Sequence, residues 1–238
     1  MEDHSRREIL KEDSLGRVLR LRAEGSDRIL REACGSWVPF TGWVARFLCR
    51  RERRALLKLE GLAGVPHLDP EDSGSGRELL RNHLPGAPLS QTIFLPRDYF
   101  DHLDALVEKV HARGVCHNDL HKEQNILVLP DGRPALLDFQ LASVHTGLGR
   151  AFESRCEEDL RHLQKHRRRY TRDGRGSSEQ SRGKGHGLKR RPLSLVWRRT
   201  GKPLYNFVTR KVLHTRDGEQ RRPSSGPWPA WQEPLGPD

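Results

Sequence analysis

The chain has 238 residues, of which 34% are hydrophobic and 32% are charged, and its formal net charge is +11. That apolar share is low for a fully compact protein of this length, so we expect part of the chain to lie outside any core. The excess of Lys and Arg favours anionic partners such as nucleotide phosphates, anionic lipid headgroups or nucleic acid. The length allows one medium domain or two small lobes around a shared cleft.

The cysteines and the apolar runs indicate the cellular compartment in which the protein is expected. The four cysteines, which form no CxxC pair, are Cys34, Cys49, Cys116 and Cys156. Their wide spacing excludes a metal-ligand or disulfide pattern and favours a reducing cytoplasm. The first ten residues hold no apolar run long enough for a signal peptide, and no stretch approaches the roughly 18–20 apolar residues of a spanning helix. We expect a cytoplasmic protein, either soluble or peripheral to the inner membrane.

Strand-like and helical patterns follow one another in the first half of the chain. Residues 18–22 largely alternate apolar and charged side chains, as a half-exposed strand does, and residues 28–31 predict the second strand of a hairpin. Residues 43–59 place apolar side chains at helical spacing. Residues 69–76 predict a turn or loop, and residues 84–88 a rigid bend.

The second half begins with a clearer helix, predicted from near Pro96 to Ala112, with an apolar stripe and a glycine after its end. Two short apolar runs follow, over residues 126–129 and 134–139. The turn residues Pro130-Asp-Gly132 separate them. This pattern predicts a β-hairpin.

The composition changes near the C-terminal end. Residues 163–194 are crowded with Arg, Lys, Gly and Ser and offer almost nothing to bury, which predicts a disordered or loosely held basic tract. We therefore divide the chain into a core over residues 1–165, a basic insert over residues 166–195, and an amphipathic segment with a Pro/Gly-rich tail over residues 196–238. The insert is either a solubilising tract or an attachment to anionic membrane. Nucleic acid is less favoured, because no aromatic residues are interleaved for base stacking.

The residues that indicate chemistry lie between Gly114 and Gln140. His117, Asp119 and Asn125 fall in a polar loop after the second helix, and Asp138 ends the second strand of the hairpin. Phosphoryl transfer needs a carboxylate that orients or deprotonates the acceptor hydroxyl, and oxygen ligands for Mg²⁺. A loop and a strand end on one hairpin hold such oxygens in fixed relation. We interpret Asp119 as the catalytic base and Asn125 with Asp138 as metal ligands.

This stretch resembles the HxD catalytic loop of the protein-kinase superfamily, followed by a DFG-like element at Asp138-Phe139. It is most similar to small bacterial RIO-like or lipopolysaccharide-kinase-like proteins, in which the metal-binding Asn comes six residues after the catalytic Asp. Asn125 stands at that distance from Asp119. Ordinary kinases place the Asn one residue earlier, where this chain has Gln124. Both remain candidates for the second ligand, and we favour Asn125 because its interval to Asp138 matches ordinary kinases.

The resemblance covers roughly residues 15–165 and implies an α+β, two-lobed, reduced protein-kinase-like fold. A small antiparallel sheet with one helix is expected in the N-lobe, about residues 10–85. A mainly helical C-lobe is expected over about residues 86–165. The resemblance also implies ATP and Mg²⁺ as cofactors, and transfer of the γ-phosphate to a hydroxyl acceptor, as in RIO-like serine/threonine protein kinases.

Further site residues follow from the same resemblance. Glu52 is the candidate ion-pair glutamate of the regulatory helix, although an exposed helix pair explains it nearly as well. Arg31 stands where kinases carry the partner lysine. His83 lies in the stretch that resembles the interlobe linker, where adenine docks. Lys122 is either a catalytic phosphate contact or a solvated loop lysine. His117 is expected to brace the backbone near the DFG-like Phe.

Departures from the family pattern leave several functions open. Residues 15–18 offer one glycine where a full phosphate loop has three, and Gln140 replaces the glycine of DFG. The acceptor could be a protein, a sugar or lipopolysaccharide glycolipid, or an aminoglycoside hydroxyl. A pseudokinase scaffold that binds nucleotide without turnover is a further alternative. So is an adaptor that acts through the basic tract on an anionic surface.

Overall fold

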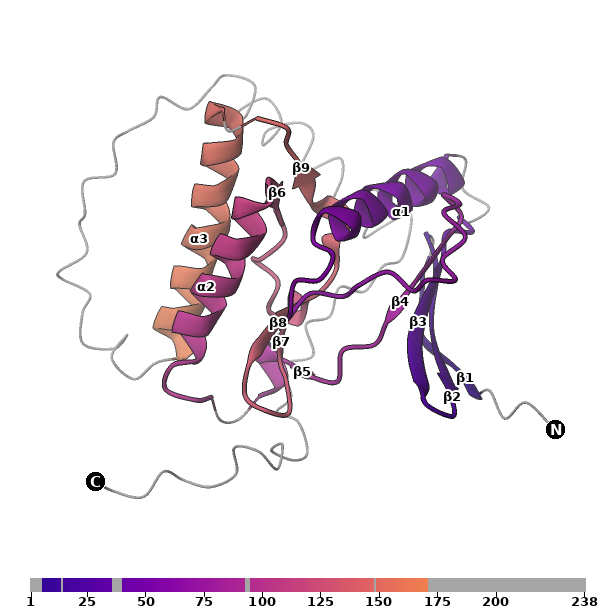
Figure 1. Cartoon of the computed structure of the whole chain (residues 1–238), viewed down its shortest axis with the longest axis horizontal. Coiled ribbons are helices and arrows are strands. Elements are labelled where there is room, and N and C mark those ends of the chain that lie inside the picture. Colours follow the sequence, from indigo (N-terminus) through magenta and orange to yellow (C-terminus); the bar gives the residue numbers. More distant parts are fainter. Residues whose placement is uncertain (1–5, 14, 36–39, 93–94, 148, 171–238) are drawn as a thin grey trace. The chain divides into compact units, whose positions relative to one another are not determined.

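The structure, a computed structural model, describes residues 6–13, 15–35, 40–92, 95–147 and 149–170 (Figure 1). The expected basic insert from residue 171 onward, and the expected C-terminal segment, lie outside the described residues. All described residues up to Arg167 belong to one compact unit, and the fold below is that of this unit. None of the helices in the described ranges has both the length and the apolar character needed to cross a membrane.

The N-lobe contains an antiparallel sheet of four strands in the order β1-β2-β3-β4. These strands are β1 (Arg6–Asp13), β2 (Gly16–Ala23), β3 (Ser26–Glu32) and β4 (Glu78–Asn82). The pairing of β2 with β3 confirms the hairpin predicted over residues 18–22 and 28–31. The outer strand β1 escaped prediction because its apolar pair, Ile9 and Leu10, is exposed and gives no alternating pattern.

Gly16, the single glycine of residues 15–18, has a structural reason to be glycine. Its φ is +144°, and a Cβ at this position would overlap the carbonyl oxygen of Glu32 on β3. Any side chain here would force β2 and β3 apart. The close approach of the two strands therefore accounts for this glycine, and a role in cradling phosphate stays a prediction.

The helix predicted over residues 43–59 is α1, which spans Thr41–Lys58. Its buried face includes Ala45, Cys49 and Leu56, which recur at helical spacing, together with the charged Glu52. α1 packs against β4 and against two short elements of the C-lobe, η3 (Phe139–Leu141) and β9 (Ser143–Val144). The helix therefore contacts both lobes.

Arg51 connects α1 to the C-lobe through hydrogen bonds. Its Nε donates to the carbonyl oxygen of Ala142 at 2.6 Å, and its Nη2 donates to that of Leu141 at 2.7 Å. Burial, and then the charge of Arg155, lower the pKa of Arg51. The two acceptors follow Asp138 by three and four residues, so this side chain joins α1 to the segment after the DFG-like element.

The C-lobe begins with short elements and α2. The connection after β4 contains β5 (Ala87–Pro88) and η1 (Leu89–Gln91), and α2 follows over Tyr99–Ala112. α2 confirms the predicted helix but begins later than Pro96, because Pro96 lies in the preceding turn, where its carbonyl oxygen accepts the N–H of Tyr99 at 3.1 Å. Its buried stripe includes Phe100, Leu103 and Val110.

The predicted hairpin is present as β7 (Ile126–Val128) and β8 (Pro134–Leu136), in a sheet of order β5-β7-β8. The second strand was predicted to reach residue 139 but ends at Leu136. Asp138 adopts left-handed backbone angles (φ 62°, ψ 66°), which turn the chain into η3. A second small sheet pairs β6 (Val115–Cys116) with β9.

The last described element is α3 (Arg150–Tyr170), which the sequence pattern did not predict. The tract expected to be loosely held from residue 163, and the insert expected from residue 166, are helical as far as Tyr170, so this part of the prediction was wrong. The buried residues of α3 are Phe152, Asp159, Leu163 and His166. Because two of these are polar, the helix shows no clear apolar period. Figure 1 shows α3 beside α2, and Arg167 binds two α2 carboxylates, those of Asp101 at 2.8 Å and Asp104 at 2.7 Å.

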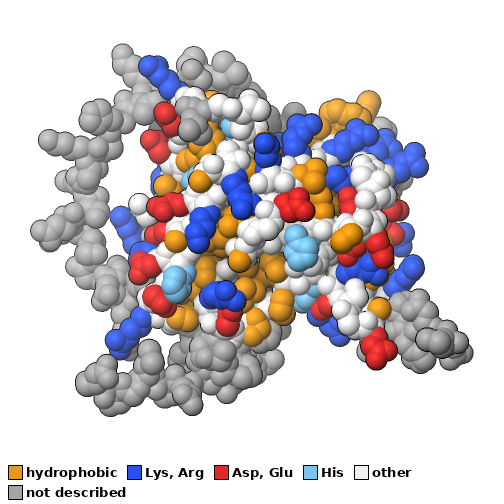
Figure 2. Space-filling view, viewed as in Figure 1, with side chains coloured by type: hydrophobic (Ala, Val, Ile, Leu, Met, Phe, Trp, Pro, Cys, Tyr) orange, Lys and Arg blue, Asp and Glu red, His pale blue; other side chains and the backbone are white. Residues whose placement is uncertain are grey.

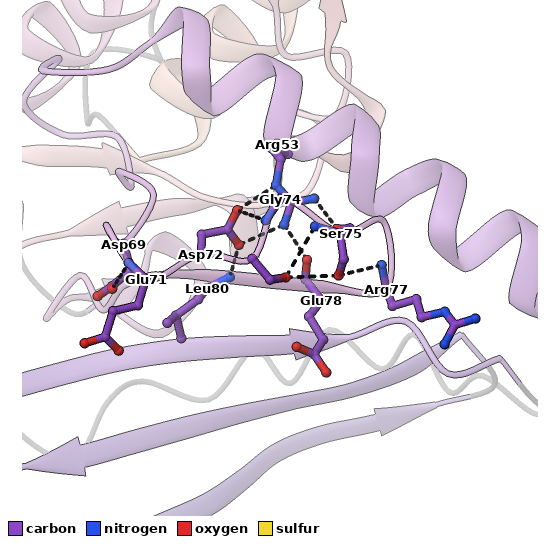
Figure 3. Close-up of polar contacts among 10 residues, drawn as sticks. Arg53, Asp69, Glu71, Asp72, Gly74, Ser75, Arg77, Glu78 and Leu80 are labelled. Carbon is purple, nitrogen blue, oxygen red and sulfur yellow. Dashed lines mark hydrogen bonds and ion pairs between the residues drawn. The ribbon is translucent and has the colours of Figure 1, made fainter.

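The loop predicted over residues 69–76 contains neither helix nor strand and folds around Asp72 (Figure 3). Arg53 of α1 donates to both carboxylate oxygens of Asp72, at 2.7 and 2.8 Å, and also to the carbonyl oxygens of Ser75 and Glu78. The backbone N–H of Leu80 donates to Asp72 at 2.8 Å. Burial alone would raise the pKa of Asp72, but the Arg53 guanidinium and the backbone donors lower it below its usual value of 3.8.

Replacing Asp72 with Asn should lower the free energy of unfolding by about 3 kcal/mol at pH 7, because it leaves Arg53 buried without its counter-charge. Because the pKa of Asp72 is lowered in the folded state, its carboxylate stabilises the fold above pH 3.8, and this contribution is lost as the pH falls through the folded pKa. The variant should therefore lose less stability on acidification than wild type. Urea unfolding at several pH values measures both effects.

Glu71→Gln is the matched control, because Glu71 is an exposed carboxylate in the same loop and its pair with Arg28 is at the surface. This variant should change the free energy of unfolding by less than about 1 kcal/mol. Equal losses for the two variants would contradict the central role of Asp72.

Candidate active site

The polar loop after β6 is hydrogen-bonded to the side chain of Asp159 on α3, which is completely buried. The backbone N–H of His117 donates to one carboxylate oxygen at 2.8 Å, and that of Asn118 donates to the other at 2.9 Å. The ring of His111 on α2 lies 3.2 Å from the same carboxylate. One side chain therefore satisfies two consecutive backbone donors and fixes the start of the loop. The sequence analysis missed this residue.

The rest of the loop has further attachments. His166 of α3 donates through Nε2 to the carbonyl oxygen of Leu120 at 2.8 Å, and its Nδ1 lies 3.6 Å from the buried carboxylate of Glu123. Asn118 has a left-handed φ of 63°, and its amide donates to the carbonyl oxygen of Leu141 at 2.8 Å and to Ser143 Oγ at 3.1 Å. α3 and the η3–β9 segment together define the loop conformation.

Asp119 lies in this loop and is 2% exposed. Its Oδ2 accepts the Asn125 amide N–H at 2.9 Å and lies 3.2 Å from the Lys122 ammonium. Its Oδ1 is buried and accepts no hydrogen bond from any described residue. The ring of His121 is in front of Oδ1 at 3.1 Å, within ion-pair distance but without hydrogen-bond geometry, and the side chain of His121 is 54% exposed. One oxygen is thus fixed and the other lacks a donor.

Asn125 and Asp138 are brought together by the backbone. The N–H of Leu137, the residue before Asp138, donates to the carbonyl oxygen of Asn125 at 2.8 Å. The Asn125 amide nitrogen is occupied by Asp119, so its side-chain oxygen is the atom left for a ligand. Gln124, the alternative, is exposed. The structure therefore brings Asn125, and not Gln124, to Asp119 and to the chain beside Asp138.

His117 has the bracing position that the resemblance implied. Its Nε2 donates to the carbonyl oxygen of Leu137 at 2.8 Å, and its ring centroid lies 4.6 Å from that of Phe139. A carbonyl oxygen can only accept, so Nε2 carries the hydrogen. Asp138 is further oriented by the Gln140 amide, which donates to its Oδ1 at 2.6 Å. Gln140, at the position where the family has glycine, thus holds one oxygen of this carboxylate.

A buried glutamate on α1 faces two arginines of the N-lobe sheet. Glu52 is 1% exposed, so the interpretation as an exposed helix pair is wrong. Arg31 Nε on β3 lies 3.4 Å from Glu52 Oε2, as the resemblance implied. Arg81 Nε on β4 lies 3.9 Å from Glu52 Oε1. The sequence analysis missed Arg81, because one arginine in a short strand is usually an exposed side chain, and this one is 9% exposed.

Arg31 also reaches across to Asp138, with Nη2 4.0 Å from Oδ1. Burial lowers the pKa of Arg31, but Glu52 and Asp138 raise it by more, and the net shift is upward. For Asp138 burial raises the pKa, but Arg31, the Gln140 hydrogen bond and Lys122 lower it by more. Burial lowers the pKa of Arg81 despite the opposing effect of Glu52. The carboxylate of Asp138 is therefore kept ionised, as a metal ligand must be.

His83 has partners that do not belong to the loop. Its ring lies 3.1 Å from the Asp27 carboxylate and 3.3 Å from Arg20, and its backbone N–H donates to the carbonyl oxygen of Asp27 at 3.0 Å. Burial and Arg20 lower its pKa, and Asp27 raises it by less. The N–H of His83 is thus occupied within the sheet, and docking of adenine beside His83 stays a prediction.

The oxygen atoms of Asp138 and Asn125 are of the kind that binds Mg²⁺. The described residues contain no group of three or more His, Cys, Asp or Glu side chains able to hold a metal. Mg²⁺ in phosphoryl-transfer sites is commonly bound by one or two carboxylates together with phosphate oxygens and water. Asp138 and the Asn125 side-chain oxygen match that donor set, which is incomplete without a nucleotide.

Comparison with known proteins supports the fold. No protein-family model matches the chain. Over an alignment of 114 residues it is 40% identical to the probable SapB synthase of Streptomyces coelicolor, a match that covers 39% of this chain and 12% of that protein. A Rio2 kinase from Chaetomium thermophilum, solved as an ADP/Mg²⁺-phosphoaspartate complex, has a TM-score of 0.52 and 17% sequence identity.

The structural similarity to the Rio2 kinase covers 71% of this chain and 56% of the Rio2 chain. This chain therefore spans little more than half of the length of the Rio2 kinase. At this identity the likeness establishes the fold. The chain has the predicted α+β, protein-kinase-like fold, with a small antiparallel N-lobe sheet. Membership of the lipopolysaccharide-kinase-like group stays a prediction.

Arg31→Met should raise the pKa of Asp138, because it removes the cation that most lowers it. Arg31→Lys should restore part of the shift. A ¹³C NMR titration of the Asp138 carboxyl group measures the change directly. Arg28→Met on the same strand is the control, since Arg28 pairs with Asp69 and Glu71 instead. An unchanged pKa in Arg31→Met would show that Arg31 does not act on Asp138.

Asp159→Asn should lower the free energy of unfolding by roughly 2 kcal/mol, because a neutral amide replaces an ionised acceptor of two backbone N–H groups. Hydrogen exchange of the His117 and Asn118 amides should accelerate more than exchange in the β2–β3 hairpin. NMR-detected exchange provides the comparison. Asp98→Asn is the control, because Asp98 is exposed and should have little effect. Uniform acceleration across the protein would indicate only global destabilisation.

Proposed function

We propose that the chain is an ATP- and Mg²⁺-dependent phosphotransferase of the protein-kinase-like kind, which moves the γ-phosphate of ATP to a hydroxyl acceptor. The observation that carries the proposal is the asymmetry of Asp119. One oxygen is fixed by Asn125 and Lys122, and the other is buried with no hydrogen-bond donor among the described residues. A buried acceptor without a partner is costly in a stable fold, and an incoming hydroxyl would satisfy it.

Asp119 is the proposed base. Its Oδ1 accepts the hydrogen of the acceptor hydroxyl and so orients the oxygen toward the phosphate. The ring of His121 lies 3.1 Å from this oxygen and its side chain is 54% exposed, so the proposal requires that it turn toward solvent when an acceptor arrives. The ammonium of Lys122 lies 3.2 Å from the other oxygen, Oδ2, and is the candidate contact for the transferred phosphate.

The residues that would hold Mg²⁺ are Asp138, through its carboxylate, and Asn125, through its side-chain oxygen. A bound Mg²⁺ would neutralise charge on the phosphates and help to align them. Arg31, kept by Glu52 at the edge of the site, is proposed to clamp phosphate oxygens. Its planar guanidinium offers paired donors where a lysine offers a point charge.

The comparisons support ATP and Mg²⁺ as the proposed cofactors. The Rio2 kinase was solved with ADP and Mg²⁺, and this chain shares its fold. We propose the same cofactors here. We favour a protein hydroxyl as acceptor, in the manner of serine/threonine kinases, with a glycolipid sugar, as in lipopolysaccharide kinases, as the alternative. A cytoplasmic location, and attachment of residues 166–195 to an anionic membrane surface, are proposals of the same kind.

A catalytically weak pseudokinase is the second candidate. It is favoured by Arg31 in place of lysine and by the position of His121 over Asp119. Such a protein would bind Mg·ATP through Asp138 and Asn125 but would not turn it over. The two candidates therefore differ in turnover and agree in binding.

Purified full-length protein should bind Mg·ATP and hydrolyse it slowly. Asp138→Asn should lose Mg-dependent binding, because a metal ligand is removed. Asp119→Asn should keep binding but lose turnover by about 100-fold or more, because the base is removed. Calorimetry and a phosphate-release assay separate the two effects. Acceptor phosphorylation is then followed with protein, glycolipid and aminoglycoside substrates.

Asp131→Asn is the matched control, since Asp131 lies in the exposed turn between β7 and β8 and pairs with Arg133. It should leave binding and hydrolysis unchanged. Binding without hydrolysis in wild type would favour the pseudokinase. Absence of any binding at millimolar Mg·ATP would overturn the proposed function.

A further inference from the structure

The outer face of α1 bears a stripe of exposed side chains that the site does not use. Residues spaced alternately four and three apart share one face of a helix. The α1 stripe consists of Trp43, Phe47, Arg50, Arg54 and Leu57. Its apolar members are well exposed, at 63% for Trp43, 47% for Phe47 and 57% for Leu57. Phe40, at the N-terminus of the helix, is 82% exposed and extends the apolar surface. This concentration of exposed aromatic residues indicates an interaction surface.

The charges along the stripe have one sign. Arg50 and Arg54 of the stripe, and the neighbouring Arg46, make no hydrogen bond or ion pair with another residue in the described part of the chain. The sole acidic residue of α1, Glu52, is buried on the face turned toward Arg31. Figure 2 shows Lys and Arg side chains gathered over the region of α1 beside hydrophobic atoms. The surface is therefore cationic and aromatic, without an exposed carboxylate on the helix.

We propose that the α1 stripe binds the surface of an anionic lipid bilayer. Trp and Phe are suited to the boundary between headgroups and acyl chains, and arginines attract anionic headgroups. A bilayer offers both kinds of contact along the whole length of a helix lying in its plane. The inference is independent of the proposed function and of the basic residues beyond the described part of the chain.

The aromatic geometry argues against nucleic acid as the partner. The rings of Trp43 and Phe47 are stacked on each other, with centroids 5.8 Å apart and planes 13° from parallel. This pairing partly restricts the ring faces on which the bases of a single-stranded nucleic acid would stack. Of the other exposed apolar residues, Val44 and Leu57 are aliphatic and offer no stacking, and Phe40 provides one further ring. These features favour insertion among lipid chains.

The test measures partition of full-length protein onto vesicles of phosphatidylcholine with and without phosphatidylglycerol. Wild type should bind the anionic vesicles and not the neutral ones. Arg50→Gln with Arg54→Gln should weaken binding about 30-fold, roughly fivefold for each arginine. Trp43→Ser with Phe47→Ser should weaken it at least about tenfold. All four side chains are exposed, so circular dichroism should show that both variants fold.

Lys109→Gln with Lys165→Gln is the charge-matched control, because both lysines are exposed, on α2 and α3. This variant should change binding less than twofold. An equal loss in the control, or no loss in the α1 variants, would overturn the proposal and assign binding to the net charge or to another segment. Sedimentation and oligonucleotide titrations complete the test. A dimer or an oligonucleotide complex that only the α1 variants disrupt, with vesicle binding intact, would also overturn it.

Discussion

The buried carboxylate of Asp159 is the constraint on which the candidate site depends. It accepts the backbone N–H groups of His117 and Asn118, and so determines where the loop starts. His117 then bonds to the carbonyl oxygen of Leu137, which fixes the chain immediately before Asp138. Asp119 and Asp138 lie on different segments, yet a short series of hydrogen bonds sets their relation. Preorganisation of this kind is what phosphoryl transfer requires, because its catalysis is mostly positioning and electrostatics.

The second feature of the site is its internal charge balance. Arg31 and Arg81 face Glu52, and Arg31 also faces Asp138, so two cations oppose two anions. Glu52 and Arg81 are buried, whereas Arg31 and Asp138 are half-buried. Buried ion networks are a weak source of stability, because desolvation offsets most of the attraction. We therefore interpret this network as a means of positioning the Arg31 guanidinium at the edge of the site. β4 supplies a second arginine, Arg81, to the same glutamate.

The sequence predicted those parts of the fold that carry a local pattern. α1 and α2 have apolar faces at helical spacing, β2 alternates apolar and charged residues, and the β7–β8 hairpin consists of two short apolar runs around Pro130-Asp-Gly132. The spacing of Asp119, Asn125 and Asp138 indicated the site. α3 was missed because its inward face alternates Phe152 and Leu163 with Asp159 and His166, which resembles a solvated charged tract. Arg81 was missed because only tertiary packing shows that its strand turns it inward. The ends of α2 and β8 depended on local backbone geometry at Pro96 and Asp138, which spacing does not encode.

The attachment of Arg51 has a mechanical consequence. Because its guanidinium grips the carbonyl oxygens of Leu141 and Ala142, α1 cannot tilt or slide without pulling on the chain that follows Asp138 or breaking both bonds. The outer face of α1, which bears the α1 stripe, is thus coupled through the helix to the contacts that Glu52 and Arg51 make on its inner face. A surface that orients the α1 stripe therefore also acts on the position of the Asp138 carboxylate.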